Sequence, residues 1–432
     1  MFSWRVVAAW SLIALSPAIT AAFTSNPASF ENLTLHALRL YGMPYVFIEI
    51  IIIGLVVSLG LRPIRVLSDF PKWALLVLGS LLVIAIFSAV NAHNKMLAVY
   101  HLNVWIIHLL FGLCIVCLAE TSPGEVKAWF WPGVVIGLIV LVILLIVYII
   151  SIPDQKSFDW RYFGFAVTNI RQIGYFTTVG AMASIGIALT QRRATPVAAA
   201  SAAASIFLAV AFWSGSRSSP LASWVAVLLS LVWFNWLRNG RSIAIIAGGS
   251  GGGLLLSRLH SVPDKHFGLE RITSSVETST LETLSSGRLE IWNAAWKAIL
   301  ERPFFGHGQG QFGIVSEARA LSIHQPHNSA LQFAFDWGLI GAGCFAALFG
   351  YLFWYCLRIT RVDPPGLLPA ALVCTALLAL SAFDGALFFP YPIMMVVAAL
   401  GWIVGTGRAY AIGDRQGIPG RALASFASVE AQ

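Results

Sequence analysis

Long apolar segments, separated by short polar connections, make up most of the chain. Several reach the roughly 20 consecutive residues that a helix needs to cross about 30 Å of hydrocarbon. The pattern predicts an all-α, polytopic membrane protein. We expect about twelve transmembrane helices, at residues 4–23, 44–61, 73–92, 97–119, 130–151, 171–190, 196–213, 219–237, 242–258, 329–357, 367–386 and 390–411.

One polar segment, residues 259–328, is much longer than the other connections and lies between the ninth and tenth predicted spans. It divides the chain into four parts. These are spans one to nine (1–258), the large loop (259–328), spans ten to twelve (329–411) and a polar tail (412–432).

Within the large loop, the stretch SSGRLEIWNAAWKAILERP predicts a helix. Its larger apolar residues recur every three or four positions, at Leu289, Trp292, Ala295, Trp296 and Ile299. We expect Ser285 or Ser286 to cap this helix and Pro303 to end it. The stripe should rest on the membrane surface or on the helix bundle, and the following FFGHGQGQFG should form a compact turn.

Charge is scarce and lies mostly in the connections. Only 11% of the residues are charged and 58% are hydrophobic, about half the charged fraction of a soluble protein. The net charge of +8 would suit nucleic acid, but no basic run exists, so we expect no nucleic-acid partner.

Lys and Arg are enriched in alternate short connections, which predicts cytoplasmic termini and a periplasmic large loop. These connections carry Arg62, Arg65 and Lys72, then Arg192 and Arg193, then Arg238 and Arg241, and then Arg358 and Arg361.

Three features of the apolar segments are expected to be structural. All five cysteines lie inside predicted spans, which favours buried packing over redox chemistry. The run GGSGGG at 248–253 should let helices approach closely. The first 23 residues resemble a signal peptide, but we expect them to be retained as the first span. An uncleaved first span agrees with the orientation that the Lys and Arg residues of the connections predict.

Charge at the rim of a membrane span is costly, so each case needs a reason. Arg217 lies among serines in FWSGSRSSPLASW, Arg171 starts span six, and Arg288 opens the loop helix, where its charge opposes the helix dipole. Arginine can bind a diphosphate through two parallel hydrogen bonds, so these residues are candidates for an anionic ligand. The alternatives are contact with lipid phosphate for Arg217, an interfacial anchor for Arg171, and pairing with Glu290 for Arg288.

The stretch HQPHNSALQF, at the start of span ten, contains a candidate base. His327 lies at the N-terminal end of a predicted helix, whose positive pole favours the neutral imidazole that can accept a proton from a hydroxyl. Asn328 adds an amide beside it, and His324 has a weaker context. A capping or surface role is the alternative for His327.

Metal and nucleotide motifs are missing from the sequence. It has no HExxH, no Walker motif and no cluster of acidic residues, so we expect neither a metal nor a cofactor. Arginines can themselves neutralise the charge that grows on a departing diphosphate.

Three stretches in order resemble the O-antigen ligase superfamily, which includes O-antigen ligases, polysaccharide polymerases and pilin glycosyltransferases. They are SGSRSSPLA (214–222), SSGRLEIWNAAWKAILERPFFGHGQGQF (285–312) and HQPHNSALQFAFDWGLIG (324–341). The resemblance implies a GT-C-like membrane fold in the bacterial inner membrane and an active site facing the periplasm. It also implies catalytic roles for Arg217, Arg288 and His327, with substrate binding by these arginines, Arg171 and Asn328.

The resemblance further implies metal-independent, inverting transfer of a glycan from undecaprenyl diphosphate. For an O-antigen ligase, the acceptor is a sugar hydroxyl of lipid A-core. A polysaccharide polymerase would instead use a second lipid-linked glycan as the acceptor. A transporter of lipid-linked glycans is an alternative of another class, but its polar residues would be expected deep within several spans rather than at one rim.

Overall fold

The structure is a computed structural model, which describes residues 4–25, 42–122, 124–160, 163–260, 268, 287–317, 323–361 and 364–415. Every regular element in these ranges is a helix, and nine of the helices are long and apolar enough to cross a membrane. The predicted class, an all-α polytopic membrane protein, is therefore confirmed.

Each of the twelve predicted spans corresponds to a helix. They are α1 (Trp4–Thr24), α3 (Met43–Ser58), α4 (Lys72–Val90), α5 (Lys95–Thr121), α6 (Gly124–Ile150), α7 (Ile173–Thr190), α8 (Ala194–Trp213), α9 (Ser218–Trp233), α10 (Gly240–Leu256), α15 (Ser329–Thr360), α16 (Pro364–Asp384) and α17 (Pro390–Arg415). Helix α3 and the 3-10 helix η1 (Pro63–Asp69) form a pair bent by 84°, which counts as a tenth span if both belong to one crossing. Helices α9 and α10 have only 16 and 17 residues, so twelve crossings remain a prediction.

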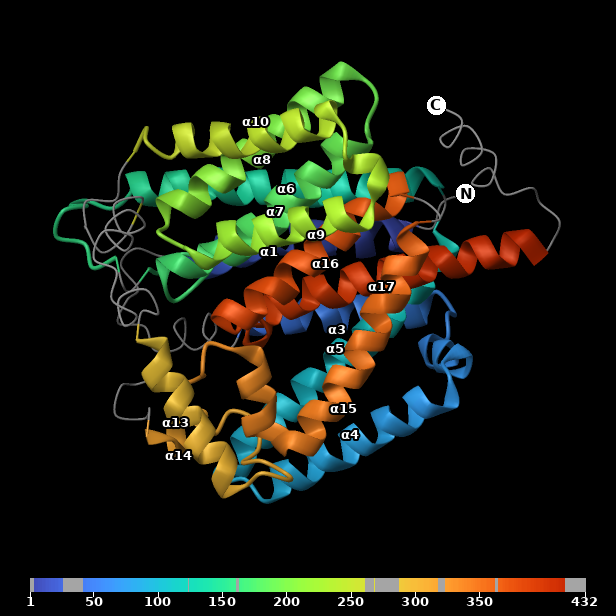
Figure 1. The fold of residues 1–432 in the computed structure, drawn as a ribbon, viewed down its shortest axis with the longest axis vertical. Coiled ribbons are helices and arrows are strands. Elements are labelled where there is room, and N and C mark those ends of the chain that lie inside the picture. The colour runs from blue at the N-terminus through green and yellow to red at the C-terminus, as the bar shows by residue number, and fades with distance from the viewer. Residues whose placement is uncertain are drawn as a thin grey trace.

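Most of the long helices run side by side, whereas α15 and α4 are oblique to them, and α13 (Arg288–Glu301) lies at one end of the bundle (Figure 1). The short helix α14 (Phe312–Val315) lies beside α13 (Figure 1). We call this end of the bundle the α13 end. Helix α17 ends on the opposite side of the molecule (Figure 1).

Helices α7, α16 and α17 form the interior of the bundle, whereas α4 and α15 lie at its periphery. The buried share of the most apolar stretch is 89% in α7 but 28% in α4 and 17% in α15. Small residues bring helices together, as predicted for the glycine run. A Cβ atom at Gly253 of α10 would lie 2.6 Å from Leu208 of α8. All five cysteines are free thiols, four of them buried and Cys344 half-buried, which agrees with a packing role.

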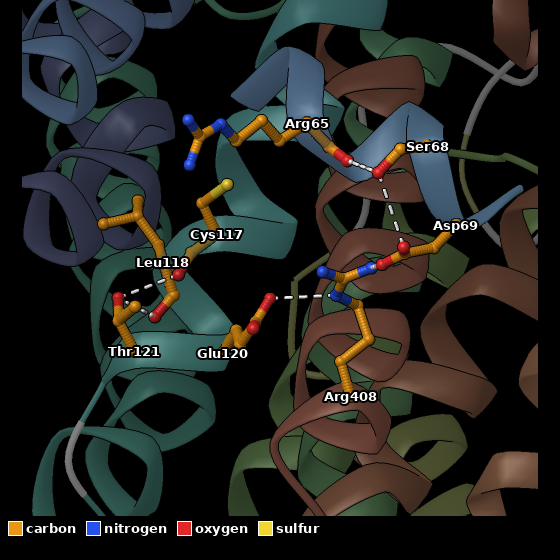
Figure 2. A network of polar contacts seen from close by, with 8 residues as sticks. All are labelled: Arg65, Ser68, Asp69, Cys117, Leu118, Glu120, Thr121 and Arg408. Carbon is orange, nitrogen blue, oxygen red and sulfur yellow. Dashed lines mark hydrogen bonds and ion pairs between the residues drawn. The ribbon is translucent and has the colours of Figure 1, made fainter. Parts of the chain in front are cut away.

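An ion-pair network joins three elements at the end opposite α13 (Figure 2). Arg408 of α17 lies between Glu120 of α5, with Nε 2.9 Å from the carboxylate, and Asp69 of η1 (Figure 2). Ser68 donates to the carbonyl of Arg65 at 2.7 Å, within η1 itself. The network holds η1 against the ends of α5 and α17, where the chain leaves α3 at a sharp bend.

A second polar pair lies inside the bundle. His108 Nδ1 of α5 lies 2.7 Å from Glu49 Oε2 of α3, and both side chains are buried. Burying two polar, ionisable side chains in a membrane is energetically costly unless they form a hydrogen bond or ion pair with each other. The pair therefore ties α3 to α5 in one register.

Helix α15 is interrupted at Gly338, which has φ 69° and ψ 177°. The segment after α13 fills the break: Leu339 donates its backbone N–H to Pro303, and His307 donates its own to Phe335. A Cβ atom at Gly338 would lie 2.3 Å from the Phe304 backbone, so only glycine fits there. The first part of α15 thus packs against the segment that follows α13. This segment, FFGHGQGQFG, is the predicted compact turn.

Helix α13 differs from its prediction in two respects. Its N-cap is Gly287, with φ 74° and no side-chain cap, rather than Ser285 or Ser286, which lie outside the described residues. Its end at Glu301, just before Pro303, is as predicted. The predicted stripe is also divided, since Ala295 and Ile299 are buried on the bundle whereas Leu289 and Trp296 are exposed. The buried residues are Ile291, Ala294, Ala295, Ala298 and Ile299.

Candidate active site

The carboxylate of Asp384 is the centre of a polar cluster at the α13 end. Asp384 is the last residue of α16, which stops where Gly385 takes the left-handed conformation (φ 61°). Its Oδ2 accepts a hydrogen bond from Ser218 Oγ at 3.0 Å, and its Oδ1 lies 3.1 Å from Arg288 Nη2 and 3.4 Å from His327 Nδ1. Side chains from α9, α13 and the turn before α15 thus converge on the half-buried carboxylate at the end of α16.

Arg288, the first residue of α13, is held from two sides. Besides its ion pair with Asp384, its Nη1 donates to the backbone carbonyl of Phe383. The side chain remains 27% exposed. Glu290, the alternative partner considered from the sequence, is exposed, and the ion pair of Arg288 is with Asp384 instead.

His327 has the left-handed backbone conformation, with φ 52°, which costs a side-chain-bearing residue about 1–2 kcal/mol. Two neighbours hold the turn. Asn328 Oδ1 accepts from the backbone N–H groups of Ala330 and Leu331, and Trp292 Nε1 of α13 donates to the Pro326 carbonyl at 3.0 Å. The helix cap is therefore Asn328, and strain of this kind at a rim residue suits a functional site.

Asn328 also connects the turn to α16. Its Nδ2 donates to the carbonyl of Ala382 at 3.1 Å. A Cβ atom at Gly385 would lie 3.1 Å from both the Asn328 nitrogen and His327 Cα, so the turn and the end of α16 are in close contact. Asn328 thus fixes the backbone that carries His327, whereas substrate binding by Asn328 stays a prediction.

Arg217 occupies the turn between α8 and α9, which the serines of SGSRSS shape. Ser214 Oγ accepts from the Ser216 N–H at 3.3 Å, and Gly215 supplies a positive φ of 70°. A Cβ atom at Gly174 of α7 would lie 2.6 Å from Ser216 Oγ, so the turn is packed closely on α7. These contacts place the half-buried Arg217 next to Ser218, which binds Asp384.

Burial and the positive charge of Arg288 both lower the pKa of Arg217, burial having the larger effect. The two guanidinium groups are therefore near enough to repel each other. An anion bound between them would relieve this repulsion. Arg288 and His327 thus meet at Asp384, and Arg217 lies next to Ser218, another partner of that carboxylate.

The structure does not bring the other two candidates, Arg171 and His324, into contact with Asp384 in the described residues. Arg171 lies in the 3-10 turn η2 (Ile170–Gln172) just before α7, and its side chain lies outside the described part of the chain. His324 is exposed, and its Nδ1 lies beside Gly313 of α14 rather than at Asp384.

Sequence reasoning missed Asp384 and Ser218. Asp384 had a usable signal: it is an acidic residue at the rim of a membrane span, the same costly position that identified Arg217. It also ends a helix, where the dipole disfavours a negative charge. Ser218 has no comparable signal, because a serine at a helix start is usually a simple cap.

No group of three His, Cys, Asp or Glu side chains arranged to hold a metal ion occurs in the described ranges. The positively charged side chains of the cluster are Arg288, which is paired with Asp384, and the half-buried Arg217 next to Ser218.

Comparison with known proteins supports the resemblance drawn from the sequence. A protein-family model described as O-antigen ligase matches residues 202–346. The match covers Arg217, Arg288 and His327, whereas Asp384 lies outside it. A search of curated proteins gives no match.

Proposed function

We propose that this chain, which belongs to the O-antigen ligase superfamily through its O-antigen ligase domain, transfers a glycan from a polyprenyl diphosphate to a hydroxyl acceptor. One observation carries the proposal. Arg288, His327 and Ser218, the residue after Arg217, come from distant parts of the chain and meet around the single carboxylate of Asp384. A base and two phosphate-binding cations are what such a transfer needs.

His327 and Asp384 provide the proton acceptor. The carboxylate lies beside Nδ1, which favours the tautomer with the proton on Nδ1 and the lone pair on Nε2. The acceptor hydroxyl gives its proton to Nε2 as its oxygen forms a bond to the anomeric carbon. Asp384 stabilises the imidazolium that results.

Arg217 and Arg288 bind and stabilise the diphosphate leaving group. The bond between the anomeric carbon and the diphosphate oxygen breaks, and the diphosphate departs with the electron pair. The guanidinium groups neutralise the charge as it develops. Attack from the face opposite the diphosphate inverts the anomeric configuration.

The location of the site at the ends of membrane helices supports substrates that are themselves anchored in the membrane. Both donor and acceptor are membrane lipids, with undecaprenyl diphosphate carrying the glycan and lipid A-core offering the sugar hydroxyl. We place the protein in the bacterial inner membrane with the α13 end facing the periplasm, and we propose no metal, cofactor or nucleic-acid partner. A second lipid-linked glycan as acceptor would make the enzyme a polysaccharide polymerase by the same chemistry.

The test is a reconstituted assay with purified protein in vesicles. One undecaprenyl-diphosphate-linked glycan is offered with lipid A-core, or alone so that a second donor molecule is the acceptor. Transfer to lipid A-core supports the ligase, and chain extension without it supports the polymerase. A His327→Asn variant is the inactive control.

Failure of the folded protein to join the glycan to either acceptor would overturn the proposal. Movement of the lipid-linked glycan across the vesicle membrane without any new glycosidic bond would identify a transporter instead.

A further inference from the structure

Both ends of α13 lie level with the ends of membrane spans. At its N-terminus, Arg288 binds Phe383 and Asp384, the last residues of α16. Just past its C-terminus, Arg302 Nη1 donates to the carbonyl of Asn91, which caps the end of α4. A helix of 14 residues is about 21 Å long, so α13 bridges two span ends and lies across the bundle, as Figure 1 shows.

Helix α13 has two apolar faces, of which the bundle covers only one. Ile291, Ala295 and Ile299 are buried against the first part of α15. On the outer side, Leu289, Trp296 and Leu300 are 49%, 47% and 58% exposed. At 100° per residue these three positions fall within about 40° of one another, so they lie on one side of the helix.

The outer stripe continues onto the exposed apolar face of α4, a candidate membrane span. The next residues, Phe304 and Phe305, are 63% and 44% exposed, and the ring of Phe305 lies 4.8 Å from that of Phe87 on α4. Phe87 belongs to the outward face of a membrane-spanning helix, with Val83 (67% exposed) one turn before it. The apolar surface of α4 therefore extends around the end of the span and onto α13.

A polar edge borders the stripe on one side. Glu290, Lys297 and Glu301 are exposed there, and Lys297 forms an ion pair with Glu317 at 3.0 Å. A helix in the membrane plane with one apolar and one charged flank is typical of an interfacial helix. Water on every side would leave three large apolar side chains, Leu289, Trp296 and Leu300, exposed on one side of a single helix without reason.

We propose that the stripe of Leu289, Trp296 and Leu300, together with Phe304, is embedded in the lipid leaflet at the α13 end, at the boundary between headgroups and acyl chains. The leaflet then covers the face that the bundle leaves open. Because Arg288 begins this helix, the contact holds its guanidinium at headgroup depth. The proposal concerns the position of the helix and does not depend on the proposed activity.

Site-directed spin labelling of the full chain in phospholipid vesicles tests this position. Cys344, the half-buried thiol, is first replaced by alanine. Labels are then attached through Trp296→Cys, Leu300→Cys and, as the matched control on the polar edge, Glu301→Cys. All three native side chains are exposed, so the substitutions leave the packing of α13 intact.

We expect the labels at 296 and 300 to be relaxed strongly by oxygen, which concentrates in lipid, and weakly by a water-soluble nickel complex. The label at 301 should show the reverse order. Equal access of the nickel complex to all three labels would overturn the proposal, because α13 would then stand clear of the leaflet.

Discussion

Asp384 Oδ1 lies 3.1 Å from Arg288 Nη2, although 96 residues separate the two in the chain. The same oxygen lies 3.4 Å from His327 Nδ1, and Oδ2 accepts from Ser218. One carboxylate therefore sets the relative positions of His327, Arg288 and the turn that carries Arg217. Each prediction about the site begins from this arrangement.

We expect Asp384→Asn to lower the turnover number by about two to four orders of magnitude, the usual size of general-base assistance. The amide is of similar size but carries no charge to stabilise the imidazolium or to hold Arg288. The measurement is steady-state transfer with a saturating donor. Asp154→Asn, at an exposed carboxylate outside the site, is the control and should be as active as the wild type. A fully active Asp384→Asn enzyme would remove this carboxylate from the mechanism.

We expect His327→Asn to fold normally and to lose activity to a similar extent, about a hundredfold or more. Asparagine is chosen because it tolerates the left-handed backbone conformation at this position better than alanine does. Donor binding should change little, since both arginines remain. His324→Asn, at an exposed histidine away from Asp384, should keep most of the activity. If instead the His324 variant is the inactive one, the assignment of the base is wrong.

We expect Arg217→Lys to weaken transfer about ten- to a hundredfold, the effect of losing one charge-assisted hydrogen bond of about 1.5–3 kcal/mol. The charge is kept, but lysine cannot make the planar two-donor contact with a phosphate. Both donor affinity and the turnover number are measured. Arg302→Lys, at an exposed arginine of the same end, is the matched control. Near-normal transfer by Arg217→Lys would show that this residue is only an interfacial anchor.

We expect transfer to continue in EDTA, because Arg217 and Arg288 supply the positive charge that a metal would otherwise bring to the diphosphate. Initial rates are compared before and after chelation and dialysis. Loss of activity that is restored by one divalent ion would contradict the prediction.

We expect His108→Leu to lower the free energy of unfolding by about 3–5 kcal/mol, because it leaves the buried carboxylate of Glu49 without its partner. The double variant Glu49→Leu/His108→Leu removes both polar groups and should be closer to the wild type. Denaturant unfolding in detergent compares the three proteins. An equal decrease in the free energy of unfolding in the single and double variants would show that packing at this position, rather than the polar pair, determines the stability.

Three residues of the candidate site could be selected from the sequence because charge at the rim of a membrane span is energetically costly. Arg217, Arg288 and His327 stand out in a chain with few charged residues, and their motifs match the family domain. The faces of α13 could not be predicted, because periodicity identifies apolar positions without saying whether protein or lipid covers them. Leu289 and Trp296 were assigned to one stripe with Ile299, yet only Ile299 is buried.

The sequence by itself determined the membrane class, the positions of the helices and the end of α13 at Pro303, because hydrophobic run length and helix breakers act locally. Only the tertiary structure decided that Asp384 of α16 faces Arg288 and His327, and that Gly338 opens α15 to the loop. These relationships depend on how helices distant in the chain pack together. A lone aspartate or glycine does not reveal its partner until that packing brings the two into contact.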